Sequence, residues 1–352
     1  MDASNTEKQN GSDLRLMPEA LRGALRELYA WDAPPLYFAG GHAWSDGTVY
    51  RYSRQGEDRL LKVMPASSER SLASVAERQA WQEWLSLNGV DTAPPLHSEA
   101  GSLAVAVNCE GQEYIVYAWR LVPGEQVQLG DPRDCADFYR RWGTLLGKMH
   151  RLAKSWPQWR HSACLDASGS PLISREREWE IFHRWFQDDG VRAAWDRMKL
   201  ALDTLPVTRE NHGFLHNDPH PGNILAESGR LILIDFDVAN YLWFMVEIAI
   251  CVYSEYSRVN FHSPWARRDA ELDSIFITPF MQGYESENTL TAGEYGRVEL
   301  FLNYRRCLMF ACFYEQIRDN APEHLARMKQ DIIQARKYLP EDNWFARRAA
   351  QS

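Results

Sequence analysis

The hydrophobic pattern of this chain differs between its first third and the rest, and this difference constrains the fold more than any other feature. Up to about residue 122, strand-like segments alternate with polar turns and two helical segments, 17–30 and 71–90. From Asp131 onward the pattern is mostly helical. This order predicts an α+β fold with two lobes, a small β-rich N-lobe and a larger, mainly helical C-lobe. The strand-like segments are 36–54, 57–65, 102–107 and 113–122.

The same pattern gives the expected boundaries. We expect a disordered start over residues 1–15, an N-lobe over 16–121 and a C-lobe over 122–352. The spacing predicts a helix over 137–152, and the Pro, Ser and Gly content predicts a loop over 155–174. Further helices are expected at 17–30, 177–205, 241–257, 268–283, 292–317 and 322–338.

Composition excludes several classes of protein. The 352 residues include 39 basic and 48 acidic side chains, and the net charge of -9 argues against binding to nucleic acid or to an anionic membrane. The acidic balance is compatible with a cationic small substrate. The longest apolar stretch, 241–253, is too short to span a bilayer, and the N-terminus lacks the apolar core of a signal peptide. The six scattered cysteines read as free thiols, so we expect a cytoplasmic protein.

The segment FLHNDPHPGNIL (214–225) concentrates the residues that are suited to chemistry. Asp218 can orient an attacking hydroxyl or accept its proton. Asn223 offers an amide oxygen to Mg²⁺, and Asp235, at the end of the apolar strand in LILIDFD (231–237), offers a carboxylate oxygen. The prolines and the glycine between Asp218 and Asn223 stiffen the turn. These are the parts that phosphoryl transfer from a nucleotide requires.

Phosphoryl transfer also needs a cation for the phosphates, and Lys62 is the candidate. It lies in the strand-like segment RLLKVM, where the period of two turns Leu61 and Val63 to the opposite face. A helix carboxylate is expected to hold the lysine, and the choices are Glu77 and Glu83. At about 100° per residue these two lie roughly 240° apart on their helix, so at most one can face Lys62.

Together these residues resemble the aminoglycoside phosphotransferase and choline kinase family, the small-molecule branch of the protein-kinase-like fold. The stretch from His216 to Asn223 looks like the motif HxDxxxxN, and the stretch from Ile234 to Asp237 looks like [IL]DF[DEG]. The resemblance extends over roughly residues 38 to 255. It includes a glycine-containing nucleotide loop and AWRLVPGE (118–125) as the hinge. The chain contains no P-loop motif.

The resemblance implies a role for each matching residue. Asp218 would be the catalytic base, Asn223 and Asp235 would bind Mg²⁺, and Lys62 would contact the phosphates of ATP or GTP with Glu77 as its partner. Asp237 stands where eukaryotic protein kinases have glycine, and Glu247 stands where the family usually has an aspartate that braces the catalytic loop. The other implied residues are Gly40, Gly41, Ala118, Arg120 and Leu121 at the nucleotide, and His216, Asp237 and Glu247 as supports of the site.

The favoured function is therefore transfer of a γ-phosphoryl group to a hydroxyl of a small molecule such as an antibiotic, amino alcohol, amino acid or sugar. The fold alone does not select among these acceptors. Three other functions stay open: a protein Ser/Thr kinase of the stress-response type, a nucleotide-binding pseudokinase, and a metallohydrolase with a metal on His216, Asp218 and His220.

Overall fold

The computed structural model describes residues 17–38, 47–67, 70–159, 163–165, 171–261 and 269–351. The chain divides into two compact units. The N-terminal unit consists of Met1–Ser86 and Ala93–Pro123, and the C-terminal unit consists of Leu87–Thr92 and Gly124–Ser352.

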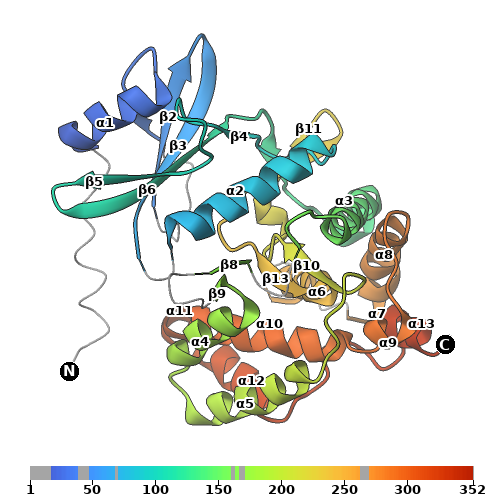
Figure 1. The fold of residues 1–352 in the computed structure, drawn as a ribbon. Helices are drawn as coiled ribbons and strands as arrows, with labels where there is room; N and C mark the ends of the chain where they lie inside the picture. Colours follow the sequence, from blue (N-terminus) through green and yellow to red (C-terminus); the bar gives the residue numbers. More distant parts are fainter. Residues whose placement is uncertain are drawn as a thin grey trace. The chain divides into compact units, whose positions relative to one another are not determined.

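The N-terminal unit is an antiparallel sheet with a helix on each face (Figure 1). Its strands follow the order β1-β2-β3-β6-β4, and β5 also pairs with β6. The central pair is β3 and β6, whose register places Lys62 opposite Tyr117. The elements are α1 (Glu19–Tyr29), β1 (Leu36–Tyr37), β2 (Thr48–Arg54), β3 (Glu57–Pro65), α2 (Leu72–Leu87), β4 (Pro95–Leu96), β5 (Val105–Cys109) and β6 (Gln112–Arg120).

The two faces of this sheet bury different side chains, as the period of two requires. Leu61 and Val63 of β3 belong to a core cluster that includes Leu21 and Leu25 of α1. Met64 belongs to a second cluster, which contains residues of α2. Because side chains alternate along a strand, Lys62 points to the same face as Met64, toward α2.

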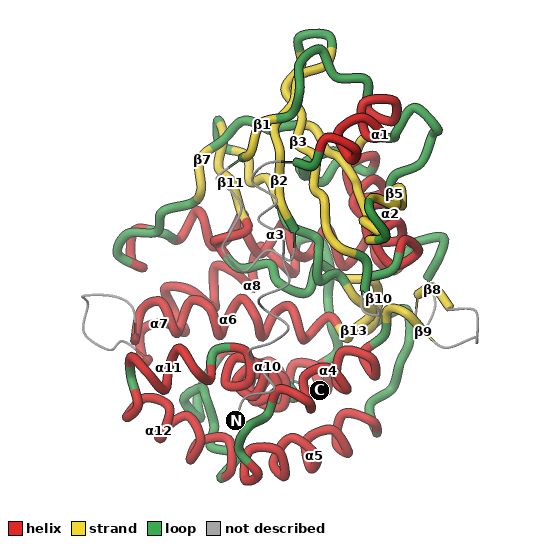
Figure 2. Tube along the Cα trace, turned by 90° about the vertical axis from the view of Figure 1, so that its left-hand side faces the viewer, coloured by secondary structure: helices red, strands yellow, loops and turns green. Residues whose placement is uncertain are grey.

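The C-terminal unit is mainly helical and contains short strands, among which β10 and β13 lie side by side (Figure 2). Its strands are β7 (Glu125–Gln126), β8 (Ala163–Leu165), β9 (Pro171–Ile173), β10 (His212–Leu215), β11 (Ile224–Glu227), β12 (Arg230–Leu233) and β13 (Asn240–Trp243). Its longer helices are α3 (Ala136–Lys154), α4 (Arg175–Trp185), α5 (Asp189–Asp203), α6 (Phe244–Phe261), α8 (Thr278–Glu285), α10 (Val298–Cys312) and α12 (Pro322–Ile333). The shorter elements are the 3-10 turns η1 (Pro132–Asp134) and η2 (Pro221–Asn223), the π-helical turn η3 (Asp273–Ile277), and the helices α7 (Asp269–Leu272), α9 (Ala292–Tyr295), α11 (Tyr314–Asn320) and α13 (Trp344–Ala349).

Helices α3 and α8 approach each other through glycine. A Cβ atom on Gly143 of α3 would lie 1.8 Å from the carbonyl oxygen of Phe280, and one on Gly283 of α8 would lie 1.9 Å from the carbonyl oxygen of Arg140. Neither position has room for a side chain, so the two backbones are in direct contact. This contact fixes α3, whose Trp142 Nε1 donates a hydrogen bond to the carbonyl of Pro219, 2.9 Å away. Pro219 directly follows His216, Asn217 and Asp218, the three residues that we call the HND motif.

The α+β fold predicted from the sequence is confirmed, with an antiparallel sheet in the N-terminal unit and a mainly helical C-terminal unit. Four local predictions were wrong. The predicted loop 155–174 contains the paired strands β8 and β9, and the predicted helix 241–257 begins as strand β13. The predicted helix 177–205 is two helices, α4 and α5, and the predicted helix 292–317 is divided among α9, α10 and α11. Among the described residues, no helix has both the length and the apolar character needed to cross a membrane.

Candidate active site

The HND motif lies in a turn between strands β10 and β11 of the C-terminal unit. Strand β10 pairs with β13, and β11 pairs with both β12 and β7, all antiparallel. The pairing of β11 with β12 sets Ile224, at the end of the turn, opposite Leu233, at the start of the segment that follows β12. The turn itself is closed by η2, where His220 Nδ1 accepts a hydrogen bond from the backbone N–H of Gly222 at 3.0 Å.

Hydrogen bonds tie Asp218, Asn223 and the Ile234–Asp235 segment together. Asn223 Nδ2 donates to the backbone carbonyl of Asp218 at 3.0 Å. The backbone N–H of Ile234 donates to the carbonyl of Asn223, also at 3.0 Å. Asn223 is buried, whereas Asp235 is exposed. The three oxygen-bearing residues expected from the sequence therefore belong to one site.

His216 links the turn that carries Asp218 to the segment that begins at Ile234. Its Nε2 donates to the carbonyl of Ile234 at 2.9 Å, and its Nδ1 accepts the backbone N–H of Asp218 at 3.2 Å. Because one ring nitrogen donates and the other accepts, these contacts suit the neutral imidazole. The ring is fully buried and packs against Phe236, with the ring centroids 4.5 Å apart.

Two residues of the site adopt the left-handed backbone conformation, which is rare for residues other than glycine. Asn217 has φ 68° and Asp235 has φ 67°. Asn and Asp tolerate this region better than most residues, because their short polar side chains bond to nearby groups. Backbone strain of this kind concentrates at functional sites, where the surroundings hold it in place. Asn217 is held by a hydrogen bond from its Nδ2 to the carbonyl of Val238 at 3.1 Å.

The carboxylate of Asp218 is held by a residue that sequence reasoning missed. Arg305 of α10 donates from Nη2 to Asp218 Oδ1 at 2.7 Å. On the other oxygen, Oδ2, His220 Nε2 lies 3.4 Å away. Burial raises the pKa of the Asp218 carboxyl, but the charge of Arg305 and the neighbouring histidines lower it by more. The pKa of Asp218 therefore lies well below its ordinary value, and the group is ionised.

A buried chain of hydrogen bonds supports the turn through Glu247 of α6. Glu247 Oε1 accepts the backbone N–H of Asn217 at 2.6 Å, and Oε2 accepts Nε2–H of His150 at 2.7 Å. On the other side of the imidazole, Tyr284 donates its hydroxyl to Nδ1 of His150 at 2.9 Å, and it accepts Nδ2–H of Asn288 at 2.7 Å. Burial lowers the pKa of His150 more than Glu247 raises it, so the imidazole is neutral.

A second carboxylate, Glu178 of α4, holds the side chain of Asn217. Its Oε2 accepts Nδ2–H of Asn217 and of Asn240, both at 2.8 Å. Its Oε1 accepts the hydroxyl of Tyr304 at 2.5 Å. Burial raises the pKa of Glu178, while its hydrogen-bond donors and Arg305 oppose that shift. The backbone and the side chain of Asn217 are thus fixed by two different glutamates.

In the N-terminal unit, the expected phosphate lysine is buried. Lys62 is 4% exposed and Glu77 is 6% exposed. The alternative partner, Glu83, is engaged elsewhere, because it accepts a hydrogen bond from His97 Nε2 at 2.7 Å and its side chain is 32% exposed. These environments favour Glu77 as the partner of the lysine, as the resemblance implies.

The expected hinge lies at the end of strand β6. Ala118 pairs with Leu61 of β3. The N–H of Arg120 donates to the carbonyl of Pro94 at 2.9 Å, and that of Leu121 donates to the carbonyl of Asp58 at 3.2 Å. Any contact with adenine must therefore use other backbone groups of this segment. The expected loop residues Gly40 and Gly41 lie outside the described residues, and Asp237 is half-buried beside Phe236.

The oxygen donors suit a hard divalent cation. Asn223 uses its Nδ2 for the carbonyl of Asp218, so its Oδ1 is the atom left for a metal, and Asp235 adds an exposed carboxylate. The metallohydrolase alternative is not supported, because both nitrogens of His216 bond to the backbone. Within the described part of the chain, no group of three or more His, Cys, Asp and Glu side chains could hold a metal ion.

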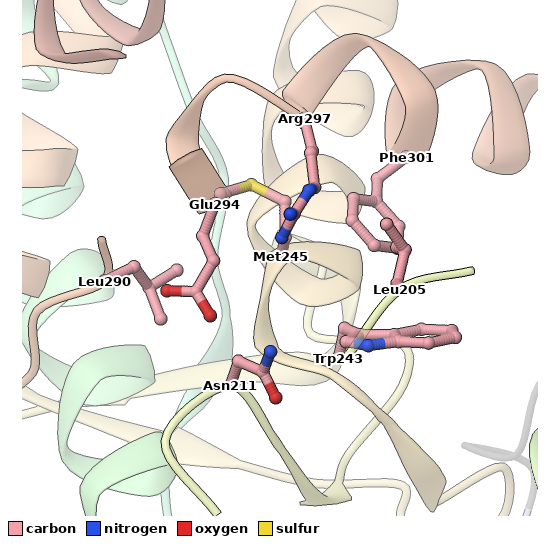
Figure 3. Close-up of a pocket in the computed structure, with 8 residues that line it drawn as sticks. All are labelled: Leu205, Asn211, Trp243, Met245, Leu290, Glu294, Arg297 and Phe301. Carbon is pink, nitrogen blue, oxygen red and sulfur yellow. The ribbon is translucent and has the colours of Figure 1, made fainter. Parts of the chain in front are cut away.

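A small pocket elsewhere in the C-terminal unit lies between α9, α10 and β13 (Figure 3). It has room for about one water molecule, which is too small for an antibiotic or an amino alcohol. The residues that line it include none of those expected from the sequence. They are Leu205, Asn211, Trp243, Met245, Leu290, Glu294, Arg297 and Phe301.

Comparison with known proteins identifies the family. Residues 39–291, well over half of the chain, match the sequence model of the APH phosphotransferase enzyme family. The chain belongs to this family. Like other phosphotransferases of the APH family, it is an ATP-dependent kinase that acts on a hydroxyl of a small molecule. The family predicted from the sequence is confirmed.

Particular members of the family are similar to this chain over most of its length. An amicoumacin kinase of Bacillus subtilis (strain 168) is 26% identical over 303 residues, which cover 82% of this chain and 84% of that protein. The structure of the amicoumacin kinase hAmiN in complex with AMP-PNP, Ca²⁺ and Ami has a TM-score of 0.78 and 22% identity, and covers 95% of this chain and 97% of its own. A microcompartment-associated aminopropanol kinase has a TM-score of 0.60 and 17% identity, and covers 89% of this chain and 93% of its own.

Proposed function

We propose that the HND turn is the catalytic loop of this kinase and that Asp218 orients the acceptor hydroxyl and takes its proton. The observation that carries this proposal is the set of hydrogen bonds that joins Asp218, Asn223 and Ile234 into one site. The ionised state of Asp218 supports it, because a base must be unprotonated before it accepts a proton.

The reaction places a different demand on each group. The acceptor oxygen forms a bond to the γ-phosphorus of ATP, the bond from that phosphorus to the β-γ bridging oxygen breaks, and the hydroxyl proton moves to Asp218. Lys62, paired with Glu77, binds the phosphates, and the backbone near Ala118 contacts the adenine. His216, Asp237 and Glu247 keep the loop in place.

Mg²⁺ is the proposed metal, and Asn223 and Asp235 are its proposed ligands. When bound, a divalent cation screens the phosphate charge and stabilises the charge that develops on the transferred group. The structure of hAmiN is a complex with AMP-PNP and Ca²⁺, which supports a divalent cation together with an adenine nucleotide. Calcium and magnesium both favour oxygen ligands, and magnesium accompanies nucleotides in most kinases.

For the acceptor, we propose an antibiotic of the amicoumacin type or a related amino alcohol. Two observations support this class: the amicoumacin kinases resemble the chain over most of its length, and the net charge of -9 favours a cationic acceptor. A protein acceptor is the second candidate, because the sequence left a protein Ser/Thr kinase open as an alternative. The same assay distinguishes a protein acceptor from a small-molecule acceptor.

The test is release of ADP from ATP in the presence of amicoumacin, 1-amino-2-propanol, choline, spectinomycin, homoserine and a generic protein substrate. We expect turnover with an amino-alcohol acceptor, and loss of turnover after chelation of divalent cations and recovery with added Mg²⁺. In Asp218→Asn, we expect turnover to fall by about 10²–10⁴-fold while the melting temperature stays within a few degrees. Full activity of a folded Asp218→Asn protein would refute the assignment of the base.

A further inference from the structure

The structure contains one strong contact with Asp218 that no family motif accounts for. Arg305 reaches Asp218 from 87 positions further along the chain, with its Nη2 2.7 Å from Oδ1. Residue 305 lies beyond the family match, which ends at residue 291. The side chain of Arg305 is 12% exposed, so the ion pair is partly shielded from solvent and is stronger than a surface pair.

Among the described residues that hold Asp218, Arg305 is the one with a permanent charge. The backbone N–H of Asp218 is bound by His216, its carbonyl accepts from Asn223, and Oδ2 faces His220 at 3.4 Å. The contact at Oδ2 is longer than a good hydrogen bond, whereas the contact at Oδ1 is short. Oδ2 is therefore the oxygen that can receive a new partner, and Oδ1 is the oxygen that is fixed.

Helix α10 is anchored on both sides of Arg305. Tyr304 donates to Glu178, which in turn holds the side chain of Asn217. Arg306 donates from Nη1 to Asn303 Oδ1 at 3.2 Å and to the carbonyl of Arg336 at 3.0 Å. Because α10 also packs against α6, the guanidinium of Arg305 is presented from a rigid element. One helix thus holds Asn217 through Glu178 and holds Asp218 directly.

We propose that Arg305 is a positioning residue for phosphoryl transfer: it fixes the Asp218 carboxylate through Oδ1 so that Oδ2 faces the acceptor hydroxyl. In the step, the hydroxyl proton moves to Oδ2, the hydroxyl oxygen bonds to the γ-phosphorus, and ADP leaves. Arg305 takes no proton and forms no covalent bond. A misplacement of about 1 Å at such a group costs on the order of 10²-fold in rate, so loss of the contact should appear in kcat.

The inference rests on the proposed function, and it is tested with three variants of the full chain. Arg305→Gln removes the charge, Arg305→Lys keeps a charge that can reach one oxygen, and Arg297→Gln removes a matched charge. Arg297 immediately precedes α10 and lines the small pocket (Figure 3). We expect kcat to fall about 10–100-fold in Arg305→Gln with KM for ATP within about twofold, partial recovery in Arg305→Lys, and no change in Arg297→Gln.

A purely structural role of Arg305 would not give this separation of kcat from KM. Addition of methylguanidinium to Arg305→Ala gives a further readout, since a small cation at Oδ1 should raise its kcat several-fold and should leave Asp218→Asn unchanged. The inference is overturned if folded Arg305→Gln keeps kcat within about twofold of the wild type, or if its loss is carried by KM for ATP.

A second measurement does not depend on knowing the acceptor. The melting temperatures of Arg305→Gln, Asp218→Asn and the double variant form a cycle, and we expect the two effects to be non-additive because the residues are in contact. Additive effects would show that the side chains of Arg305 and Asp218 do not interact, and would overturn the inference. Should Arg305→Gln fail to fold, the same cycle with Arg305→Lys applies, with the same two outcomes. Failure of the proposed function would appear differently, as a wild-type protein that transfers no phosphoryl group.

Discussion

Glu247 offers the sharpest test of how the catalytic turn is held. Its carboxylate is fully buried and accepts two N–H donors, the backbone of Asn217 at 2.6 Å and the imidazole of His150 at 2.7 Å. Glu247→Ala leaves both donors buried without an acceptor and also leaves a cavity. A buried donor left without an acceptor costs about 1–3 kcal/mol, so the two donors together cost about 2–6 kcal/mol. For a unit of this size, that loss lowers the midpoint of thermal unfolding by roughly 4–24 °C.

Glu247→Gln should cost less, because the amide oxygen can still accept one donor. The NH2 group of the new side chain then faces the N–H of His150. One N–H donor is therefore left without an acceptor, and the expected cost is about 1–3 kcal/mol. Glu323→Ala, at an exposed position in the first turn of α12, is the control and should cost under about 1 kcal/mol. The measurement is thermal unfolding followed by circular dichroism. An Ala variant within about 1 kcal/mol of the wild type would refute this reasoning about the turn.

Three further outcomes are expected. Gly143→Ala should destabilise the C-terminal unit by about 1–3 kcal/mol in urea unfolding, because the new methyl group meets the carbonyl oxygen of Phe280; an unchanged midpoint would mean that α3 and α8 can separate at no cost. The fold lowers the pKa of His150. The contribution of neutral His150 to the free energy of unfolding is therefore complete above about pH 6.5, and it is lost as pH falls, by up to about 1.4 kcal/mol per pH unit. That part of the slope should vanish in His150→Gln, and an identical slope would contradict a neutral His150. Lys62→Met should lower kcat/KM for ATP by about 10²–10³-fold in a steady-state assay while the protein stays folded, and a smaller loss would remove Lys62 from the phosphate site.

Much of the fold could be predicted because its signals are local. The alternation around Lys62 gave its face of the sheet, and the helical spacing gave α3 to within two residues at each end. Strand β13 was missed because a short, continuous apolar run is compatible with either a buried strand or a buried helix. Strands β8 and β9 were missed because their segment has the composition of a loop.

The turn with Asp218 and Asn223 could be found from sequence because its residues are close neighbours in the chain. Arg305 could not, because an arginine within an amphipathic helix carries no local signal that it meets Asp218, 87 positions earlier. The same holds for Glu178, which lies 39 positions before Asn217. Such contacts follow from tertiary packing. Secondary-structure propensity and hydrophobic periodicity report only on local structure and do not predict them.

The most direct measurement is the fate of a labelled γ-phosphoryl group. The protein is incubated with ATP labelled at that position, Mg²⁺ and amicoumacin, and the small-molecule and protein fractions are separated and analysed by mass spectrometry. We predict one labelled phosphoryl group on a hydroxyl of the small molecule, formed by the wild type and Arg297→Gln but not at a comparable rate by Asp218→Asn. Label found on protein, or an equal rate in the Asp218→Asn variant, would contradict this prediction.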